Sequence, residues 1–196
     1  MKRLLFVTGQ PGVGKTSVLL RVIDALKAKG YDVRGMITRE IREQGTRVGF
    51  EIIDLYMGQK GWLAHVNQSS GPRIGKYRVN LDDLKNIGVN SILNAIKNAD
   101  VIIIDEIGPM ELFSQAFKDV ILQAIDSTKP LIGTIHFKAQ NALINAIKAR
   151  NDVEILEVTN ENRQSMHNII IAKVLNTLSY DNSKHERTRK ISNRKA

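Results

Sequence analysis

The sequence predicts an α/β fold in which helices cover both faces of a mainly parallel sheet. Short, mostly apolar runs alternate along the chain with segments whose apolar side chains recur every three or four positions. The runs are typical of strands in a covered sheet, and the helical segments between them are long enough to serve as crossovers. One region, residues 39–80, interrupts this alternation.

The first unit is a strand over 4–7, a glycine-rich turn and a helix over 15–29. The apolar residues of the helix keep helical spacing, and Gly30 is typical of the position that follows a helix. A second strand is expected over 33–38. The chain therefore begins as a strand–turn–helix–strand unit.

Residues 39–80 have a different character, with short, partly alternating segments separated by glycine-rich turns and no helical period. These segments are 48–55, 62–66 and 76–79. The pattern predicts an insertion of antiparallel strands. About forty residues are too few to form a separate domain readily, so the insertion is assigned to the main domain.

The α/β alternation resumes after Asn80, which we expect to cap the next helix. The expected elements are helices over 81–98, 112–125, 139–149 and 161–178, and strands over 101–105, 131–135 and 153–158. Residues 1–180 are thus predicted to form one domain. Residues 181–196 carry six basic and two acidic residues and almost no apolar ones, and a disordered basic tail is expected there.

The charge of the chain is its one unusual bulk property. Lys and Arg number 29 against 20 Asp and Glu, a net charge of +9, which favours a polyanionic partner such as nucleic acid, an anionic membrane or a phosphate-rich ligand. The absence of cysteine excludes disulfides, thiolate zinc sites and a cysteine nucleophile. Apolar runs are too short for a signal peptide or a membrane span, so a cytoplasmic protein without membrane contact is expected.

The turn after the first strand fits the pattern G-x-x-x-x-G-K-[ST] in full. Its residues are Gly9, Gln10, Pro11, Gly12, Val13, Gly14, Lys15 and Thr16, and Ser17 follows within the expected nucleotide-binding segment. Glycines let backbone N–H groups converge on phosphate oxygens, and the helix that follows adds the positive end of its dipole. We expect Lys15 to reach the β- and γ-phosphates and the Thr16 hydroxyl to bind Mg²⁺.

A second group of candidate residues ends the apolar strand over 101–105. Asp105 and Glu106 are adjacent, so in a regular strand they point to opposite sides and have different roles. In a P-loop enzyme Asp105 would hold the Mg²⁺ shell beside Thr16. Glu106 would orient a water molecule and accept its proton, which makes hydrolysis the expected reaction.

Each of the remaining candidate side chains has either a functional or a purely structural interpretation. Thr134 and His136 end the next apolar strand and are either sensors of the γ-phosphate or structural; Arg163 either stabilises charge in the transition state or is simply exposed. Candidate arginine fingers in the insertion, which are otherwise solvated, are Arg39, Arg42, Arg47, Arg73 and Lys76. Trp62 and Tyr77 either stack on a base or, as we prefer, pack within the protein.

Several motifs together resemble the small P-loop nucleoside-triphosphatase family, which has thermophile and human members. They are residues 9–16, Gly49-Phe50, Leu63-Ala64, Gly75-Lys76-Tyr77, the segment Asp105-Glu106-Ile107-Gly108-Pro109-Met110-Glu111, and Asn162-Arg163. The resemblance covers residues 1–178. It implies a RecA-like parallel sheet with core strand order 5-1-4-3-2 and slow, Mg²⁺-dependent hydrolysis of several nucleoside triphosphates.

Three hypotheses for the function remain open at this point. The main one is a nucleoside-triphosphatase in which Lys15 and Glu106 are catalytic and Mg²⁺ is the cofactor. A nucleotide or small-molecule kinase would use the same loop and carboxylates, with the insertion as acceptor site. An NTP-dependent nucleic-acid-binding protein would use the basic tail, although no basic motif interleaved with aromatic residues supports specific recognition.

Overall fold

The computed structural model describes residues 2–192, and the side chains of residues 2–180. Its strands are β1 (Leu4–Thr8), β2 (Val33–Glu43), β3 (Thr46–Asp54), β4 (Lys60–His65), β5 (Arg73–Ile74), β6 (Tyr77–Val79), β7 (Val101–Ile107), β8 (Leu131–Ile135) and β9 (Val153–Glu157). Its helices are α1 (Lys15–Ala28), α2 (Leu81–Asp83), the π-helix η1 (Leu84–Val89), α3 (Asn90–Asn98), the 3-10 helix η2 (Glu111–Phe113), α4 (Gln115–Asp126), α5 (Ala142–Lys148) and α6 (Met166–Ser192).

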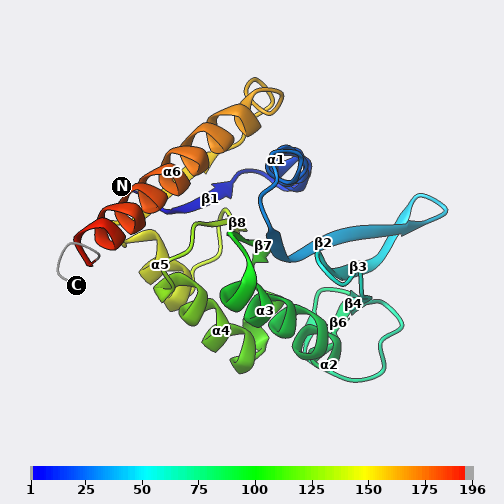
Figure 1. Ribbon diagram of the computed structural model, residues 1–196. Helices are drawn as coiled ribbons and strands as arrows, with labels where there is room; N and C mark the ends of the chain where they lie inside the picture. Colours follow the sequence, from blue (N-terminus) through cyan, green and yellow to red (C-terminus); the bar gives the residue numbers. More distant parts are fainter. Residues whose placement is uncertain (1, 193–196) are drawn as a thin grey trace.

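Within this range all nine strands join one mixed sheet in the order β5-β6-β4-β3-β2-β7-β8-β1-β9. The five strands of the predicted α/β unit, β9-β1-β8-β7-β2, are parallel throughout. Helices α1 and α6 cover one face of this parallel half, and α3, α4 and α5 cover the other (Figure 1). The α/β class with helices on both faces is therefore confirmed.

Each face of the sheet has its own apolar core because successive strand residues point to opposite sides. In β1, Leu4 and Phe6 pack with α3, α4 and α5, whereas Leu5 and Val7 pack with α1 and α6. The four side chains are at most 2% exposed. Strand β1 is thus buried on both sides, and the turn that follows it stands on a rigid base.

The insertion forms antiparallel strands, as predicted, but it extends the main sheet and starts as a continuation of β2. Strand β2 runs past the expected end at 38 to Glu43 and turns through two residues into β3. Those two residues, Gln44 and Gly45, have φ angles of 47° and 79°, the positive values of a tight hairpin turn. Strands β4, β6 and β5 then add to β3, all antiparallel (Figure 1).

Helix boundaries differ from the prediction where polar caps lie inside the predicted range. The side chain of Asn80 accepts a hydrogen bond from the Asp83 N–H at 3.0 Å, which confirms the expected cap. Ser114 and Asn141 cap α4 and α5 in the same way, so these helices start later than expected at 112 and 139. The helical range 81–98 is confirmed, with a π-helical segment in its middle.

The last helix starts later and ends later than predicted. Residues 160–165 form turns, and α6 continues to Ser192. The helix thus runs through 181–192, where a disordered tail is expected, and residues 193–196 lie outside the described residues. No Gly or Pro interrupts the chain from Met166 to Ser192, and a helix that is already nucleated extends at little cost. Within the described part of the chain, no helix has the length and apolar character needed to cross a bilayer.

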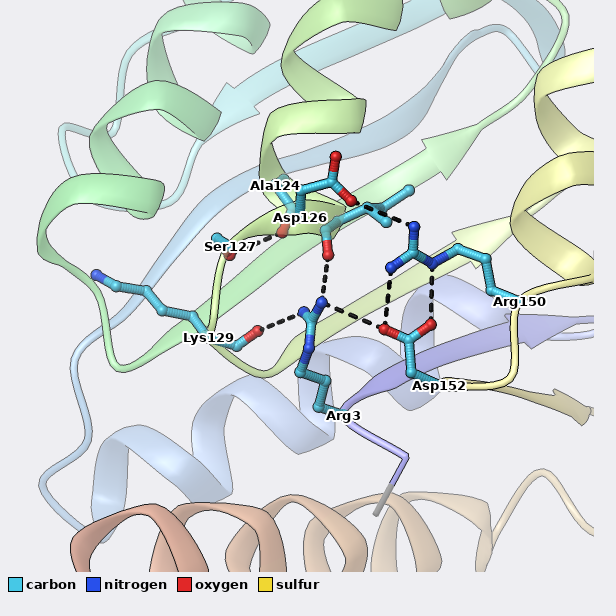
Figure 2. A network of polar contacts seen from close by, with 8 residues as sticks. Arg3, Ala124, Asp126, Ser127, Lys129, Arg150 and Asp152 are labelled. Carbon is cyan, nitrogen blue, oxygen red and sulfur yellow. Dashed lines mark hydrogen bonds and ion pairs between the residues drawn. The ribbon is translucent and has the colours of Figure 1, made fainter. Parts of the chain in front are cut away.

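A polar network ties together the amino ends of β1, β8 and β9 (Figure 2). Arg3 donates to the carbonyls of Ile125 and Lys129 and contacts Asp152 at 3.2 Å. Arg150 in turn donates to Asp152 at 2.9 Å. This network stabilises the edge of the sheet formed by the amino ends of the strands. The phosphate-loop motif lies at the opposite edge, at the carboxyl ends.

Candidate active site

The glycine-rich turn between β1 and α1 has the backbone that the phosphate-loop motif requires. Gly14, immediately before α1, has a φ angle of 107°. Gly9 has a φ angle of 145°, and a Cβ atom there would lie 2.5 Å from the Val158 carbonyl oxygen. Since only glycine fits such a conformation and such a close approach, these positions set the path of the loop.

The lysine of the loop folds across its own backbone. The Lys15 Nζ donates to the carbonyl oxygens of Gly9 at 3.2 Å and Gln10 at 3.4 Å. Both bonds are long, so the ammonium group can exchange them for phosphate oxygens. Thr16 is half-buried and close enough to Asp105 to lower the pKa of that carboxyl, while Ser17 is exposed at the start of the helix.

Asp105 is a buried carboxyl at the end of β7, with 1% of its surface exposed. Burial raises the pKa of this carboxyl to about 6, and the negative charge of Glu106 raises it as well. The hydroxyls of Thr134 and Thr16 and the positive charge of Lys15 oppose this shift. Its Oδ1 accepts from the Thr134 hydroxyl, whereas its Oδ2 has no hydrogen-bond partner among the residues described. Such an oxygen beside a threonine hydroxyl is a ready ligand for a hard cation.

Glu106 lines a cavity together with the loop, and burial raises the pKa of its carboxyl, opposed by the charge of Lys15. Lys15 also lowers the pKa of Asp105, so both carboxyls face the same lysine. The pairing of β7 with β8 shifts register between Ile104 and Ile107, so strict alternation of side chains is interrupted at these two residues. That Asp105 and Glu106 have different roles stays a prediction.

Glu111 is a third buried acid, to which the sequence interpretation gave no role. It is 4% exposed, and its Oε2 accepts a hydrogen bond from the Gly108 N–H at 3.1 Å. Burial and the negative charges of Glu106 and Asp105 raise its pKa to about 8. A glutamate five residues beyond an adjacent acid pair was the only signal of this cluster in the sequence.

The two residues at the end of β8 have different positions. Thr134 is fully buried and donates to Asp105, so it holds that carboxyl in place. His136 lines the cavity, and its Nδ1 accepts from the Ala139 N–H at 2.9 Å. Burial and the charges of Lys15 and Lys148 lower the pKa of His136. The ring is therefore neutral at pH 7, with its proton on Nε2.

Arg163 lies beside the phosphate loop even though it is far away in the sequence. A Cβ atom on Gly14 would be 4.0 Å from the Arg163 Cδ. The preceding turn is held by Asn162, whose Oδ1 accepts from the Thr159 N–H at 2.9 Å and whose Nδ2 donates to the Glu157 carbonyl at 2.9 Å. The side chain is exposed, so the guanidinium group can move toward a ligand in the loop.

The candidate arginine fingers of the insertion differ in whether they line the cavity next to the phosphate loop. Among these five described side chains, Arg39 and Arg47 line the cavity, whereas Arg42, Arg73 and Lys76 do not. Arg39 pairs with Glu51 at 2.7 Å, and Arg47 pairs with Glu40 at 2.9 Å. Both cations therefore already have a partner.

The aromatic residues of the insertion pack within the protein, as we preferred. The ring of Trp62 lies 4.4 Å from that of His65 on the sheet surface. Tyr77 is buried, with its ring edge-on to Phe50 at 5.4 Å and its hydroxyl bonded to Arg47 at 2.8 Å. Neither aromatic ring lines a cavity next to the loop.

Two cavities flank the phosphate loop and share its residues 10–12. The smaller one, about 290 Å³, lies between the loop and residues 157–161. The larger one, about 840 Å³, contains Lys15, Glu106 and His136 and continues to the strands of the insertion. The charged side chains that suit a terminal phosphate are thus on one side of the loop, and the smaller cavity is on the other.

Comparison with known proteins shows that most of the chain is similar in sequence to one family of nucleoside-triphosphatases. A model of the NTPase family matches residues 4–171. The nucleoside-triphosphatase THEP1 of Thermofilum pendens is 45% identical over 158 residues, which cover 80% of this chain and 87% of that protein. The THEP1 of Methanosarcina acetivorans is 43% identical over 88% of this chain and 97% of its own.

Two solved structures are similar in fold as well as in sequence. THEP1 of Aquifex aeolicus superposes with a TM-score of 0.77 at 30% identity, over 87% of this chain and 98% of that one. A human cancer-related nucleoside triphosphatase superposes with a TM-score of 0.75 at 35% sequence identity, over 88% of this chain and 97% of that one. The resemblance noted in the motifs is confirmed: the chain belongs to the NTPase family, together with proteins named nucleoside-triphosphatase THEP1.

Proposed function

We propose that the protein is a Mg²⁺-dependent nucleoside-triphosphatase that hydrolyses ATP, GTP and other NTPs to the diphosphate and phosphate. The observation that carries this proposal is the convergence of Lys15, Asp105 and Glu106 beside the phosphate loop. Relatives that share 40–45% of their residues over most of the chain are named nucleoside-triphosphatases. We also assign the parallel half to the RecA-like class with core order 5-1-4-3-2, which the order β9-β1-β8-β7-β2 supports.

The two cavities give the nucleotide a direction. Lys15 and Glu106 line the larger cavity, so the terminal phosphate belongs there. The nucleoside then lies on the other side of the loop, in the smaller cavity beside Thr159 and Asn160. Its wall, formed by residues 10–13 and 157–161, carries no aromatic residue, which fits a site that accepts several bases.

The residues at the end of β7 fit a magnesium ion. Asp105 offers its unpartnered Oδ2, and the Thr16 hydroxyl is close enough to the same carboxyl to lower its pKa. Among the residues described, no three His, Cys, Asp or Glu cluster as a metal cage. This agrees with Mg²⁺, which commonly takes one or two protein ligands and completes its shell with phosphates and water. When bound, the ion would supply positive charge to the phosphate oxygens.

The side chains divide the remaining work of hydrolysis. Lys15 exchanges its carbonyl partners for β- and γ-phosphate oxygens, and Arg163 adds positive charge from the far side of Gly14. Glu106 orients the attacking water and accepts its proton; the burial that raises its pKa also makes it a better base. Thr134 keeps Asp105 in place, and the Nε2–H of His136 is a donor for the released phosphate.

Phosphate release with each of the four common NTPs, with and without Mg²⁺, tests this proposal. Lys15→Ala should abolish turnover, and Glu106→Gln should abolish it while nucleotide still binds. Exposed Glu43→Gln, outside both cavities, is the control for loss of a carboxylate. If the Glu106 variant hydrolyses ATP at the parental rate, Glu106 is not the base.

Steady release of phosphate over many turnovers without an added acceptor also separates hydrolysis from the kinase alternative. A kinase would release phosphate only slowly until an acceptor is supplied. A nucleic-acid-dependent activity would instead rise on addition of RNA or DNA and fall with salt. No basic motif interleaved with aromatic residues supports specific recognition of nucleic acid, so the hydrolase remains the proposal that the site supports best.

A further inference from the structure

The larger cavity extends well beyond the groups that suit a phosphate chain. Its volume of about 840 Å³ is near the upper end of the range for pockets that enclose a complete drug-sized ligand. The polyphosphate is only part of a nucleotide, and the nucleoside has the smaller cavity. The part that remains, here called the outer pocket, is lined by Arg39, Arg47, Phe50, Leu63, Ile74 and Met110.

The floor of the outer pocket is apolar and lies where a main core, to which Leu63 belongs, meets a smaller cluster. Phe50, Ile74 and Met110 are only partly buried and pack on a small cluster formed by Ala64, Tyr77 and Val79. Apolar side chains that face a water-filled cavity lose the free energy that their full burial would provide, about 25 cal/mol per Å². A ligand with an apolar body would recover this free energy.

The rim of the outer pocket holds a planar cation in a fixed position. The guanidinium of Arg47 lies 5.1 Å from the centre of the Phe50 ring and 5.6 Å from that of Tyr77. The Tyr77 hydroxyl accepts from its Nε at 2.8 Å, and Glu40 accepts from its Nη1 at 2.9 Å. A guanidinium held close to aromatic rings is suited to stacking on another flat ring and to pairing with an acidic group.

The charges on this rim limit the ligand further. Arg39, Arg47 and Glu40 line the outer part of the cavity and together carry one positive charge, whereas Glu51, which pairs with Arg39, is not part of the lining. A polyanion would be a poor match, because both arginines are already paired with glutamates. A single acidic group on an aromatic body complements the rim and the floor together.

We propose that the outer pocket binds a second small molecule, an aromatic compound with one acidic group, beside the terminal phosphate of the nucleotide. Glu106 and the outer pocket line one continuous cavity, so the bound molecule lies at the approach of water to Glu106. The second molecule therefore lowers the rate of hydrolysis while it is bound. The position of this ligand relative to the nucleotide rests on the proposed function; the pocket itself does not.

The test uses 8-anilinonaphthalene-1-sulfonate, a fluorescent aromatic monoanion, as the probe with the full-length protein. We expect saturable binding to one site and a dissociation constant at least tenfold higher for Arg47→Gln and for Ile74→Asn. Both positions tolerate substitution, because Arg47 is exposed and Ile74 lies in a two-residue strand. Matched controls are Arg73→Gln, in the same strand but outside the cavity, and Ile169→Asn, an exposed apolar residue of α6.

Binding should persist when a non-hydrolysable ATP analogue and Mg²⁺ saturate the protein, and the probe should inhibit phosphate release. Equal affinity of all four variants, or complete displacement of the probe by the analogue, overturns the outer pocket. If the probe binds as expected but the parental protein hydrolyses no NTP, the proposed function fails and the pocket stands. If hydrolysis is normal but the Arg47 and Ile74 variants bind the probe like the parent, only the pocket fails.

Discussion

Replacing Glu111 by glutamine is expected to remove a large part of the pH dependence of the stability of the nucleotide-free protein. The carboxyl is buried beside Asp105 and Glu106, and its pKa is raised from 4.5 to about 8. Glutamine keeps the side-chain oxygen that accepts the Gly108 N–H but has no charge to bury. The substitution therefore changes the titration while it preserves the shape and the hydrogen bond.

The sign and size follow from proton linkage. Between pH 4.5 and pH 8 the folded protein holds a proton on Glu111 that the unfolded chain has released, so the free energy of unfolding falls as pH rises. The slope is at most about 1.4 kcal/mol per pH unit. From pH 5.5 to pH 7.5 the parental protein should therefore lose about 2.5 kcal/mol relative to Glu111→Gln. About one pH unit below 4.5 and above 8 the difference between the two proteins becomes constant.

Urea unfolding at half-unit steps from pH 5 to pH 9, with a chelator and without nucleotide, measures this difference directly. The comparison between two proteins cancels the titration of the other acids to the extent that they are not coupled to Glu111. Exposed Glu157→Gln controls for the loss of a carboxyl elsewhere. Parallel curves for the parent and Glu111→Gln would refute the assignment of a protonated Glu111 in the folded protein.

Three further substitutions test the loop, the acid cluster and the distal network. Gly9→Ala places a Cβ atom 2.5 Å from the Val158 carbonyl oxygen; stability should fall by about 1–3 kcal/mol in urea unfolding, and nucleotide affinity should fall in calorimetry. Thr134→Val removes the hydrogen bond to buried Asp105; it should lower stability by about 1–3 kcal/mol and also lower kcat, and Thr134→Ser should restore both. Arg3→Ala should lower stability by about 2–3 kcal/mol with unchanged kcat in the phosphate-release assay, because its partners lie at the opposite edge of the sheet.

The sequence was sufficient to predict elements whose pattern is local. Strands such as β1 and β7 are short apolar runs, and α1 shows helical spacing that ends at Gly30. Boundaries were less predictable, because Ser114 and Asn141 could have been either helical or capping residues until the tertiary structure determined which. The strand was expected to end at residue 38, although pairing with β3 keeps the mostly charged residues 39–43 in the sheet.

The candidate site also combines features that the local sequence predicts with features that depend on contacts between distant segments. The phosphate loop was predictable because its backbone requires glycine at fixed positions, which leaves a pattern in the sequence. The bond between Thr134 and Asp105, the burial of Glu111 and the placement of Arg163 against Gly14 depend on contacts between distant segments. No local pattern encodes those contacts. The outer pocket is a further example, since its wall comes from β2, β3, β4, β5 and the loop after β7.

The ends of the nine-stranded sheet also bear on aggregation. A long, uncharged outer strand offers unpaired backbone groups on which another chain can add a strand. Here the outermost strand on one side is β5, with only two residues, one of them Arg73. On the other side β9 has five residues, including Glu154 and Glu157. Short, charged edges at both ends discourage edge-to-edge polymerisation, so a sheet this wide can remain confined to one molecule.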